Sequence, residues 1–360
     1  MKYESKREGK VMKKLLAMML VTCMSVSVLA GCGAKTEEAA AETTEAATEE
    51  AVTEEAVTEE AATEETEAAA EETEYKIGVI QLVEHAALDA ANQGFIDGLN
   101  EAGIKYTVDQ QNAQGDQTAC DTIASKLVND GNDLILAIAT PAAQAVAGKT
   151  TDIPILVTAV TDPETSGLVA SNEAPGGNVS GTSDLTPVKE QIALLTEILP
   201  EAKTVGILYC SAEDNSIFQA DIAKAEIEAA GLAWEEFTVS SSNEIQSVVE
   251  SAIGKVDAIY APTDNMIAAG MTTVAMVANE NKIPVICGEA GMVEAGGLAT
   301  YGIDYYNLGK MTAEQAVKIL KGEAKTAETP IGYLTADQCE FAGNDETAAT
   351  LGIDLSAYAK

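Results

Sequence analysis

The sequence predicts an α/β protein whose folded part forms two doubly wound parallel-sheet lobes around a hinge and a cleft. Short segments rich in Val and Ile alternate with segments of helical periodicity, which is typical of parallel sheets covered by helices on both faces. The alternation begins twice, at Ile77-Gly78-Val79 and again at Val205-Gly206-Ile207. Two similar series indicate two lobes, each large enough for its own hydrophobic core.

The first series precedes a segment rich in Gly and Ser, Gly177–Leu185, which we interpret as the break between the lobes. Its apolar runs predict four strands: Lys76–Leu82, Lys105–Gln110, Asp133–Ala139 and Pro154–Val160. The segments of helical periodicity predict four helices, the last of them beyond the break: Ala86–Ala102, Asp116–Asn129, Ala142–Gly148 and Pro187–Leu199.

The second series repeats this arrangement. Its predicted strands are Thr204–Tyr209, Ala233–Val239, Asp257–Ala261, Pro284–Cys287 and Leu298–Ile303. Its predicted helices are Asn215–Ala230, Asn243–Ile253, Asn265–Asn279 and Leu308–Leu320.

The N-terminal segment has the features of a secretion signal. Lys13 and Lys14 precede an uncharged apolar run, Leu15–Ala30, which is shorter than the ~20 residues of a spanning helix. The run closes with Leu29-Ala30-Gly31-Cys32, which resembles the bacterial lipoprotein box. The resemblance implies a signal peptide over 1–31 and a diacylglycerol on the sulfur of Cys32. The alternative is an uncleaved anchor helix, and both place the body at a membrane, outside the cytoplasm.

Residues 32–74 predict a disordered tether. Thr-Glu-Glu-Ala-Val recurs with a period of five, which matches neither a helix nor a strand, and residues 35–74 carry sixteen Glu against one Lys. Like charges and few large apolar side chains favour an extended chain. A helix rich in Glu and Ala is the alternative, because both residues have high helix propensity.

Composition excludes several classes of function. The net charge of −37 argues against a nucleic-acid partner, which requires a basic surface. One His and widely spaced Cys residues give no zinc-binding constellation, so no metal is expected. The sequence lacks the glycine-rich nucleotide loops and the Gly-x-Ser-x-Gly elbow, so we expect no cofactor and no enzymatic activity. Chemistry by Asp and Glu alone stays open at this point.

Polar residues follow most of the predicted strands. The carboxyl ends of parallel strands in two facing lobes line one cleft, so these residues are the candidate ligand contacts. They are Gln81, Glu84, His85, Thr140, Ala142, Thr158, Ser183, Asp184, Tyr209, Asn215, Asp264, Asn265, Glu289 and Asp304. Some have a local alternative: Thr140 and Thr186 each precede a proline as helix caps do, and Thr263 or Asp264 suits the cap of the next helix.

The charges of these candidates suggest one class of small-molecule ligand. Helix N-termini at the strand ends favour a carboxylate, whereas Asp264, Glu289 and Asp304 favour an ammonium group. Such a cleft suits an amino-acid zwitterion. For stacking on a ligand ring we favour Tyr209, because it ends a strand; the other rings considered are Phe95, Phe218, Tyr305 and Tyr306.

Several segments, in order between about 75 and 340, resemble the ABC-transporter substrate-binding lipoproteins of the tryptophan/tyrosine type. They are Gln81–Asp89, Ala139–Gln144, Val160–Pro163, Gly177–Asp184, Tyr260–Asn265 and Gly302–Gly309. The resemblance implies a type I periplasmic-binding-protein fold, with chain crossings between the lobes near Ser183, Asp304 and Tyr333. The implied lobes are 75–182 with 305–333, and 183–304 with 334–360.

The resemblance also implies capture of a small solute by hinge closure and its delivery to an ABC permease in the membrane. Aromatic amino acids are the substrates most often assigned to this family. Two alternatives stay open: a membrane-tethered sensor of the same fold, and an importer component for a sugar or nucleoside. Trp234 begins a strand, which disfavours a stacked sugar, and the scarcity of Arg and Lys at the strand ends disfavours a phosphorylated ligand.

Overall fold

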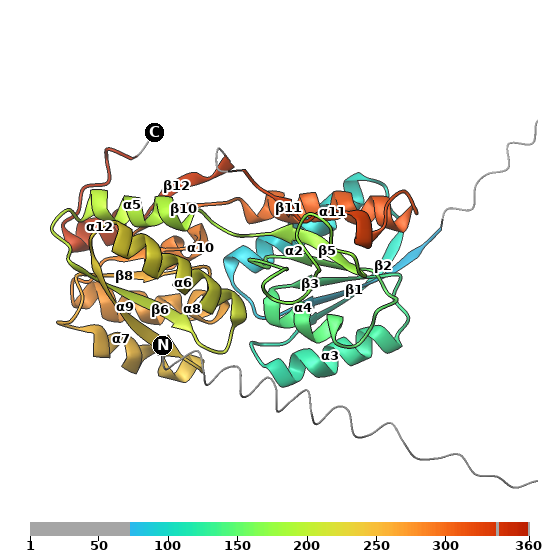
Figure 1. Cartoon of the computed structure of the whole chain (residues 1–360), viewed down its shortest axis with the longest axis horizontal. Coiled ribbons are helices and arrows are strands. Elements are labelled where there is room, and N and C mark those ends of the chain that lie inside the picture. Colours follow the sequence, from blue (N-terminus) through green and yellow to red (C-terminus); the bar gives the residue numbers. More distant parts are fainter. Residues whose placement is uncertain (1–72, 336–337, 359–360) are drawn as a thin grey trace, which may run out of the picture. The chain divides into compact units, whose positions relative to one another are not determined.

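The computed structural model describes residues 73–335 and 338–358. They form two six-stranded sheets with helices on both faces of each, which confirms the predicted α/β class (Figure 1). The predicted signal peptide, Cys32 and nearly all of the tether lie outside the described residues. Within the two described ranges, no helix has the length and apolar character needed to cross a bilayer.

The first sheet has the order β11-β5-β4-β3-β1-β2, and all its pairs are parallel. Its strands are β1 (Tyr75–Gln81), β2 (Tyr106–Asn112), β3 (Leu134–Ile138), β4 (Ile155–Thr158), β5 (Val179–Ser183) and β11 (Gly332–Tyr333). In register, Val79 of β1 pairs with Gln110 of β2 and with Leu136 of β3. Strand order therefore reverses at β1, the position where doubly wound sheets open a crevice at the strand ends.

Four helices cover the first sheet in two pairs. They are α2 (Ala86–Glu101), α3 (Gln117–Asn129), α4 (Thr140–Ala147) and α11 (Tyr305–Leu320). Helix α2 packs along α11 on one face, and α3 packs beside α4 on the other. The core between these layers and the sheet includes Phe95, Leu99 and Leu308, all fully buried.

The second sheet has the order β12-β10-β9-β8-β6-β7. Its strands are β6 (Thr204–Cys210), β7 (Ala233–Val239), β8 (Ala258–Ala261), β9 (Val285–Cys287), β10 (Ala299–Gly302) and β12 (Glu340–Gly343). The sheet is parallel except at its edge, where β12 runs antiparallel to β10 and pairs Ala299 with Gly343. The sequence predictions did not include β11 and β12, which contain two and four residues.

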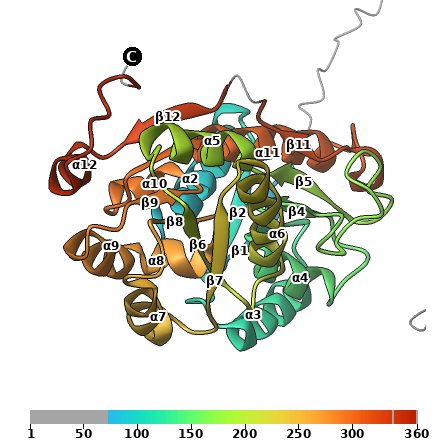
Figure 2. The same cartoon turned by 60° about the vertical axis from the view of Figure 1, so that its left-hand side comes forward.

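The helices of the second sheet also form two layers (Figure 2). They are α5 (Val188–Ile198), α6 (Asp214–Ala229), α7 (Ile245–Ala252), α8 (Asn265–Ala269), α9 (Met271–Glu280), α10 (Ala290–Glu294) and α12 (Asp345–Leu351). Helices α5 and α6 pack together against one face, and α7 packs with α9 on the other. Two 3₁₀ turns complete the described elements: Ser242–Glu244 and Thr326–Glu328.

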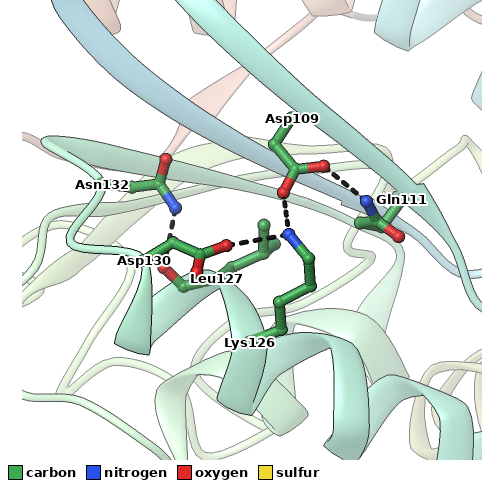
Figure 3. A network of polar contacts seen from close by, with 6 residues as sticks. All are labelled: Asp109, Gln111, Lys126, Leu127, Asp130 and Asn132. Carbon is green, nitrogen blue, oxygen red and sulfur yellow. Dashed lines mark hydrogen bonds and ion pairs between the residues drawn. The ribbon is translucent and has the colours of Figure 1, made fainter.

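A polar network ties β2 to α3 at the edge of the first sheet (Figure 3). Lys126 of α3 forms ion pairs with Asp109 of β2 and with Asp130, and Asp109 also accepts a bond from Gln111. Beside it, the Asn132 side chain donates to the carbonyl oxygen of Leu127 over 2.7 Å. The ion pairs are exposed to solvent, so they contribute little to stability and serve mainly to cover an edge strand.

Two predictions at element boundaries differ from the structure. Gly177–Leu185 is not only a break, because it contains the fully buried strand β5. The predicted helix Asn265–Asn279 is two helices, α8 and α9, which meet at Gly270 where the Ile245 side chain lies too close for a Cβ atom.

The two predicted Thr-Pro caps also differ. Ala139 precedes α4 with a φ of 82°, so Thr140 is already inside the helix. The N-cap position of α5 is held by Pro187 instead of Thr186, and no side chain caps this helix. By contrast, Asp264 caps α8 as one of the two predicted alternatives, since it accepts the N–H of Ile267 over 2.7 Å.

Candidate functional site

A narrow cavity lies at the carboxyl ends of strands from both sheets. The void between its atoms measures about 270 Å³, including solvent at its mouth. Its lining comes from the segments after β1, β4, β5, β6, β8, β9 and β10: His85, Leu88, Ala159, Thr161, Asp184, Asn215, Thr263, Asp264, Asn265, Ala268, Glu289 and Tyr305. The lining contains acids and amides but no Lys or Arg.

The Asp184 carboxyl lies on the side of the cavity nearest the chain crossing after β5. It is 5% exposed and accepts bonds from the Tyr305 hydroxyl over 2.8 Å and from the Thr161 hydroxyl over 3.2 Å. Burial raises its pKa, and the two hydroxyl donors oppose that shift. A cationic group entering the cavity would meet a carboxyl with no positive partner in the lining.

Two further carboxyls begin helices of the second sheet. Asp264 accepts the backbone N–H of Cys210 over 2.5 Å and of Ile267 over 2.7 Å, and burial raises its pKa. Glu289 accepts the N–H groups of Gly291 and Met292 over 2.5 and 2.8 Å, and burial raises its pKa to about 7. Both acids therefore fix a helix start and face the cavity at the same time.

The imidazole of His85 contributes from the first sheet's side. Its Nε2 lies 3.4 Å from Oδ1 of Asn265, and burial lowers its pKa, so the ring is neutral near pH 7. Nδ1 of His85 has no hydrogen-bond partner among the described residues. Helix α2 begins at this histidine without any side-chain cap, and α6 begins without one after Glu213. Two long helices thus start at or beside cavity-lining residues with uncapped N–H groups.

The structure brings six of the fourteen candidates into the lining: His85, Asp184, Asn215, Asp264, Asn265 and Glu289. The other eight lie elsewhere. Three are buried near the cleft without lining it: Thr140, Ala142 and Thr158. Ser183 donates to the carbonyl oxygen of Thr161 over 2.6 Å, and Gln81 donates to Asp89 over 2.6 Å.

The remaining three candidates do not line the cavity. Glu84 is exposed to solvent, and Asp304 is an exposed cap that accepts the N–H of Asn307 over 3.1 Å. Tyr209 packs into the core beside α5 and α6, and its hydroxyl donates to Glu236 over 2.6 Å. Tyr305 is the candidate ring that lines the cavity.

Six lining residues were absent from the predicted set, namely Leu88, Ala159, Thr161, Thr263, Ala268 and Tyr305. Thr161 and Thr263 follow strands as the fourteen candidates do, and Tyr305 was among the rings considered for stacking. The buried acid Glu213, which bonds two lining amides, was also missed. An acid at a helix start normally indicates a solvated position, so nothing local in the sequence marks it.

Comparisons with known proteins agree on one family. Residues 76–358 match the family model of the ABC transporter substrate binding protein. The chain is 39% identical over 350 residues, 96% of its length and 94% of the other, to the "Tyrosine-binding protein" of Clostridioides difficile strain R20291.

Two similar solved structures come from bacterial relatives. A crystal structure of an ABC domain from Streptococcus pneumoniae in complex with L-Trp is 43% identical, with a TM-score of 0.76, and covers 79% of this chain and 96% of that one. The ligand-free, open structure of a substrate binding protein with adhesive properties from Clostridium difficile is 45% identical, with a TM-score of 0.60, and covers 78% of this chain and 95% of that one.

Proposed function

This chain belongs to the family of ABC transporter substrate-binding proteins, whose members work outside the cytoplasm, and on that premise we propose that its ligand is an aromatic amino acid, tyrosine or tryptophan. The observation that carries the proposal is a cavity lined by three buried carboxyls, two amides and a tyrosine ring without a cation. Relatives described as tyrosine-binding or solved with L-Trp support the same ligand class.

The two charges of a zwitterion have complementary partners in this cavity. We assign the ammonium group to the side of Asp184, Asp264 and Glu289, because a buried carboxyl gains most from a cationic donor. The carboxylate is assigned to the uncapped N-termini of α2 and α6, where backbone N–H groups and the positive end of the helix dipole meet an anion. Leu88, Ala159, Ala268 and the ring of Tyr305 supply apolar contacts for the ligand ring.

We infer that the lobes are in a closed arrangement. The structure superposes better on the L-Trp complex than on the ligand-free, open structure, although the two relatives are about equally similar in sequence. The narrowness of the cavity supports the same inference, because a ligand of amino-acid size can enter only when the lobes separate.

The finer details of localisation are proposals as well. We propose that residues 1–31 are removed as a signal peptide and that lipid on Cys32 anchors the protein to the outer face of the cell membrane, with 32–74 as a tether. Mass spectrometry of the N-terminal peptide from membrane-purified protein tests the anchor. An unmodified Cys32, or an intact N-terminus, would contradict it.

A thermal-shift and calorimetry screen of residues 33–360 tests the ligand. L-Tyr or L-Trp should raise the melting temperature, because a ligand at 100 times its dissociation constant stabilises the folded state by about 2.7 kcal/mol. The variant Glu289→Gln should bind more weakly, whereas Glu190→Gln, exposed on α5, should bind like the wild type. Binding of a sugar or nucleoside, with no response to any amino acid, would overturn the proposal.

A further inference from the structure

Glu213 is a buried carboxyl that the candidate site does not include. It lies between β6 and α6, is 5% exposed, and forms no ion pair with any Lys or Arg in the part of the chain that the structure describes. Burial without a cation is costly for a carboxylate, and burial beside Asp264 raises the pKa of Glu213. A side chain held at such a cost calls for a role beyond stability.

The carboxyl of Glu213 accepts a backbone hydrogen bond from Met266 and side-chain hydrogen bonds from two amides of the cavity lining. Nδ2 of Asn265 donates to its Oε2 over 2.6 Å, and Nδ2 of Asn215 donates to the same oxygen over 3.4 Å. An ionised carboxylate only accepts hydrogen bonds, and a protonated one still accepts at its unprotonated oxygen. Oε2 of Glu213 therefore accepts hydrogen bonds when the group is ionised, and it still does so in the protonated form that carries its proton on Oε1.

The first consequence concerns Asn215. Because its N–H₂ group faces Glu213 and the Ser216 hydroxyl, its carbonyl Oδ1 must lie at the opposite side of the amide. Oδ1 has no hydrogen-bond partner among the described residues, although Asn215 is only 4% exposed and lines the cavity. An unpartnered buried acceptor is unfavourable, and a donor group on a ligand would satisfy it.

The second consequence reaches across the cavity to His85. With Nδ2 of Asn265 held by Glu213, the same amide presents Oδ1 to Nε2 of His85, 3.4 Å away. An amide oxygen accepts only, so Nε2 must carry the proton of the neutral ring. Nδ1 of His85 is then an acceptor, and it is also unpartnered among the described residues.

We propose that Glu213 is a positioning residue that fixes the hydrogen-bond polarity of the ligand cavity: through Asn215 and Asn265 it leaves Oδ1 of Asn215 and Nδ1 of His85 as acceptors. The proposal deepens the proposed function, since an aromatic amino acid brings a donor besides its ammonium group, the phenol or indole hydrogen, that suits such an acceptor. His85 follows β1 of the first sheet, whereas Glu213 follows β6 and Asn265 follows β8 of the second. The hydrogen-bond relay from Glu213 through Asn265 to His85 is therefore complete only when the two lobes are together. The other titratable groups around Glu213 are Asp264, Cys210 and Cys120.

The tautomer of His85 can be read directly, because the chain contains a single histidine. We would label an untagged full chain with ¹⁵N-histidine and record the ring nitrogens by NMR at pH 7.5 without ligand. The relay requires a neutral ring with the proton on Nε2. A ring protonated on Nδ1 would overturn the proposal, and this experiment needs neither a variant nor a ligand, so it remains decisive if the proposed ligand is wrong.

Two variants of Glu213 separate positioning from packing. Glu213→Leu removes the acceptor, so the amides lose their fixed direction, and we expect mixed His85 tautomers and about tenfold weaker binding of L-Tyr or L-Trp. Glu213→Gln keeps an acceptor oxygen and should retain both the Nε2–H form and an affinity within about threefold of wild type. Glu226→Leu, on the same helix and outside the lining, is the control.

Each outcome either supports the positioning role of Glu213 or overturns it. A leucine variant with the wild-type tautomer and affinity would overturn the proposal, as would a glutamine variant as impaired as the leucine variant. If Glu213→Leu does not fold, the His85 tautomer of the wild type and the affinity of Glu213→Gln still test the proposal. If the wild type binds neither aromatic amino acid, the proposed function fails while the tautomer experiment stands alone.

Discussion

Glu289 shows at the scale of one residue how burial and function meet. Its carboxyl is 3% exposed, caps α10 through two backbone N–H groups, and has a pKa raised to about 7 because burial penalises its charge. Asp184 and Asp264 also have raised pKa values for the same reason. An incoming ammonium group would favour the charged forms, so the cavity is prepared for a cation that the protein does not itself provide.

The raised pKa values predict how stability depends on pH. Glu289 keeps its proton up to about pH 7 in the folded protein, whereas in the unfolded chain it loses the proton above about pH 4.5. Between these pH values the folded state binds more protons than the unfolded chain, so the free energy of unfolding falls as pH rises towards 7. Between pH 5.5 and 7.5 we expect Glu289 alone to lower the unfolding free energy of the ligand-free protein by on the order of 1–3 kcal/mol, and Glu213, whose pKa burial raises to about 8, acts in the same direction. The lowered pKa of His85 acts in the opposite direction, chiefly below pH 6.5.

Melting temperatures across this range check the prediction. The fall should be smaller in Glu289→Gln and unchanged in Glu190→Gln. A melting temperature that rises towards pH 7.5 would show that these carboxyls are ionised when buried.

The residues of the candidate site could be predicted only in part from their positions in the sequence. The rule that ligands bind beyond strand ends located His85, Asp184, Asn215, Asp264, Asn265 and Glu289, all of which line the cavity. The rule does not say which face of the sheet a side chain takes. Tyr209 ends its strand with the ring directed into the core beside α5 and α6, whereas Tyr305, at the start of a helix, lines the cavity.

At the scale of elements, the contact between α2 and α11 depends on glycine. A Cβ atom on Gly309 would collide with the carbonyl oxygen of Ala91, and one on Gly94 would collide with that of Tyr306. The two helices approach so closely because each offers bare backbone to the other. Tyr305, which lines the cavity and donates to Asp184, begins α11, so this packing also positions a site residue.

Gly309→Ala should therefore destabilise the protein strongly. Overpacking typically costs about 1–3 kcal/mol, which corresponds to a melting temperature lower by roughly 2–10 °C for a chain of this size. Gly177→Ala is the matched control, because a Cβ atom there meets no other atom within 4 Å. Equal melting temperatures for the two variants would contradict the assignment of α2 and α11 as a tight contact.

Elements with a local pattern were predictable, and elements held by distant partners were not. The apolar strands β1, β3 and β6 and the helices that follow them are evident from periodicity alone. Strand β5 reads Val-Ser-Gly-Thr-Ser, yet it is fully buried because Thr182 bonds Thr158 and Thr312, and Ser180 bonds the carbonyl oxygen of Thr329. Those partners lie up to 149 residues away, so no window of sequence could reveal them.

At the scale of the molecule, glutamine side chains join helices of the first sheet to residues of the second lobe. Gln144 of α4 donates to Asp214 of α6 over 2.8 Å, and Gln117 of α3 donates to the carbonyl oxygen of Ala212 over 3.1 Å. Neither glutamine lines the cavity. Both therefore favour the closed arrangement without contacting a ligand.

Gln144→Ala should shift the protein towards an open arrangement. The loss of one such bond, about 1 kcal/mol, predicts roughly fivefold faster ligand release with little change in the rate of association. Stopped-flow fluorescence measures the release rate, and small-angle scattering measures the radius of gyration. Gln93→Ala removes a bond to Asp97 within one helix and should change neither quantity. Slower association with an unchanged release rate would contradict the idea that the Gln144–Asp214 hydrogen bond holds the lobes closed.

The interleaved order of the two sheets has a consequence for how the molecule folds. The first sheet is completed by β11, and its face is covered by α11, both of which come after nearly all of the second sheet in the chain. The N-terminal half therefore cannot reach its final structure until about residue 333 is available to it. Contacts of such long sequence separation slow folding, so a newly made chain spends longer with the first sheet incomplete.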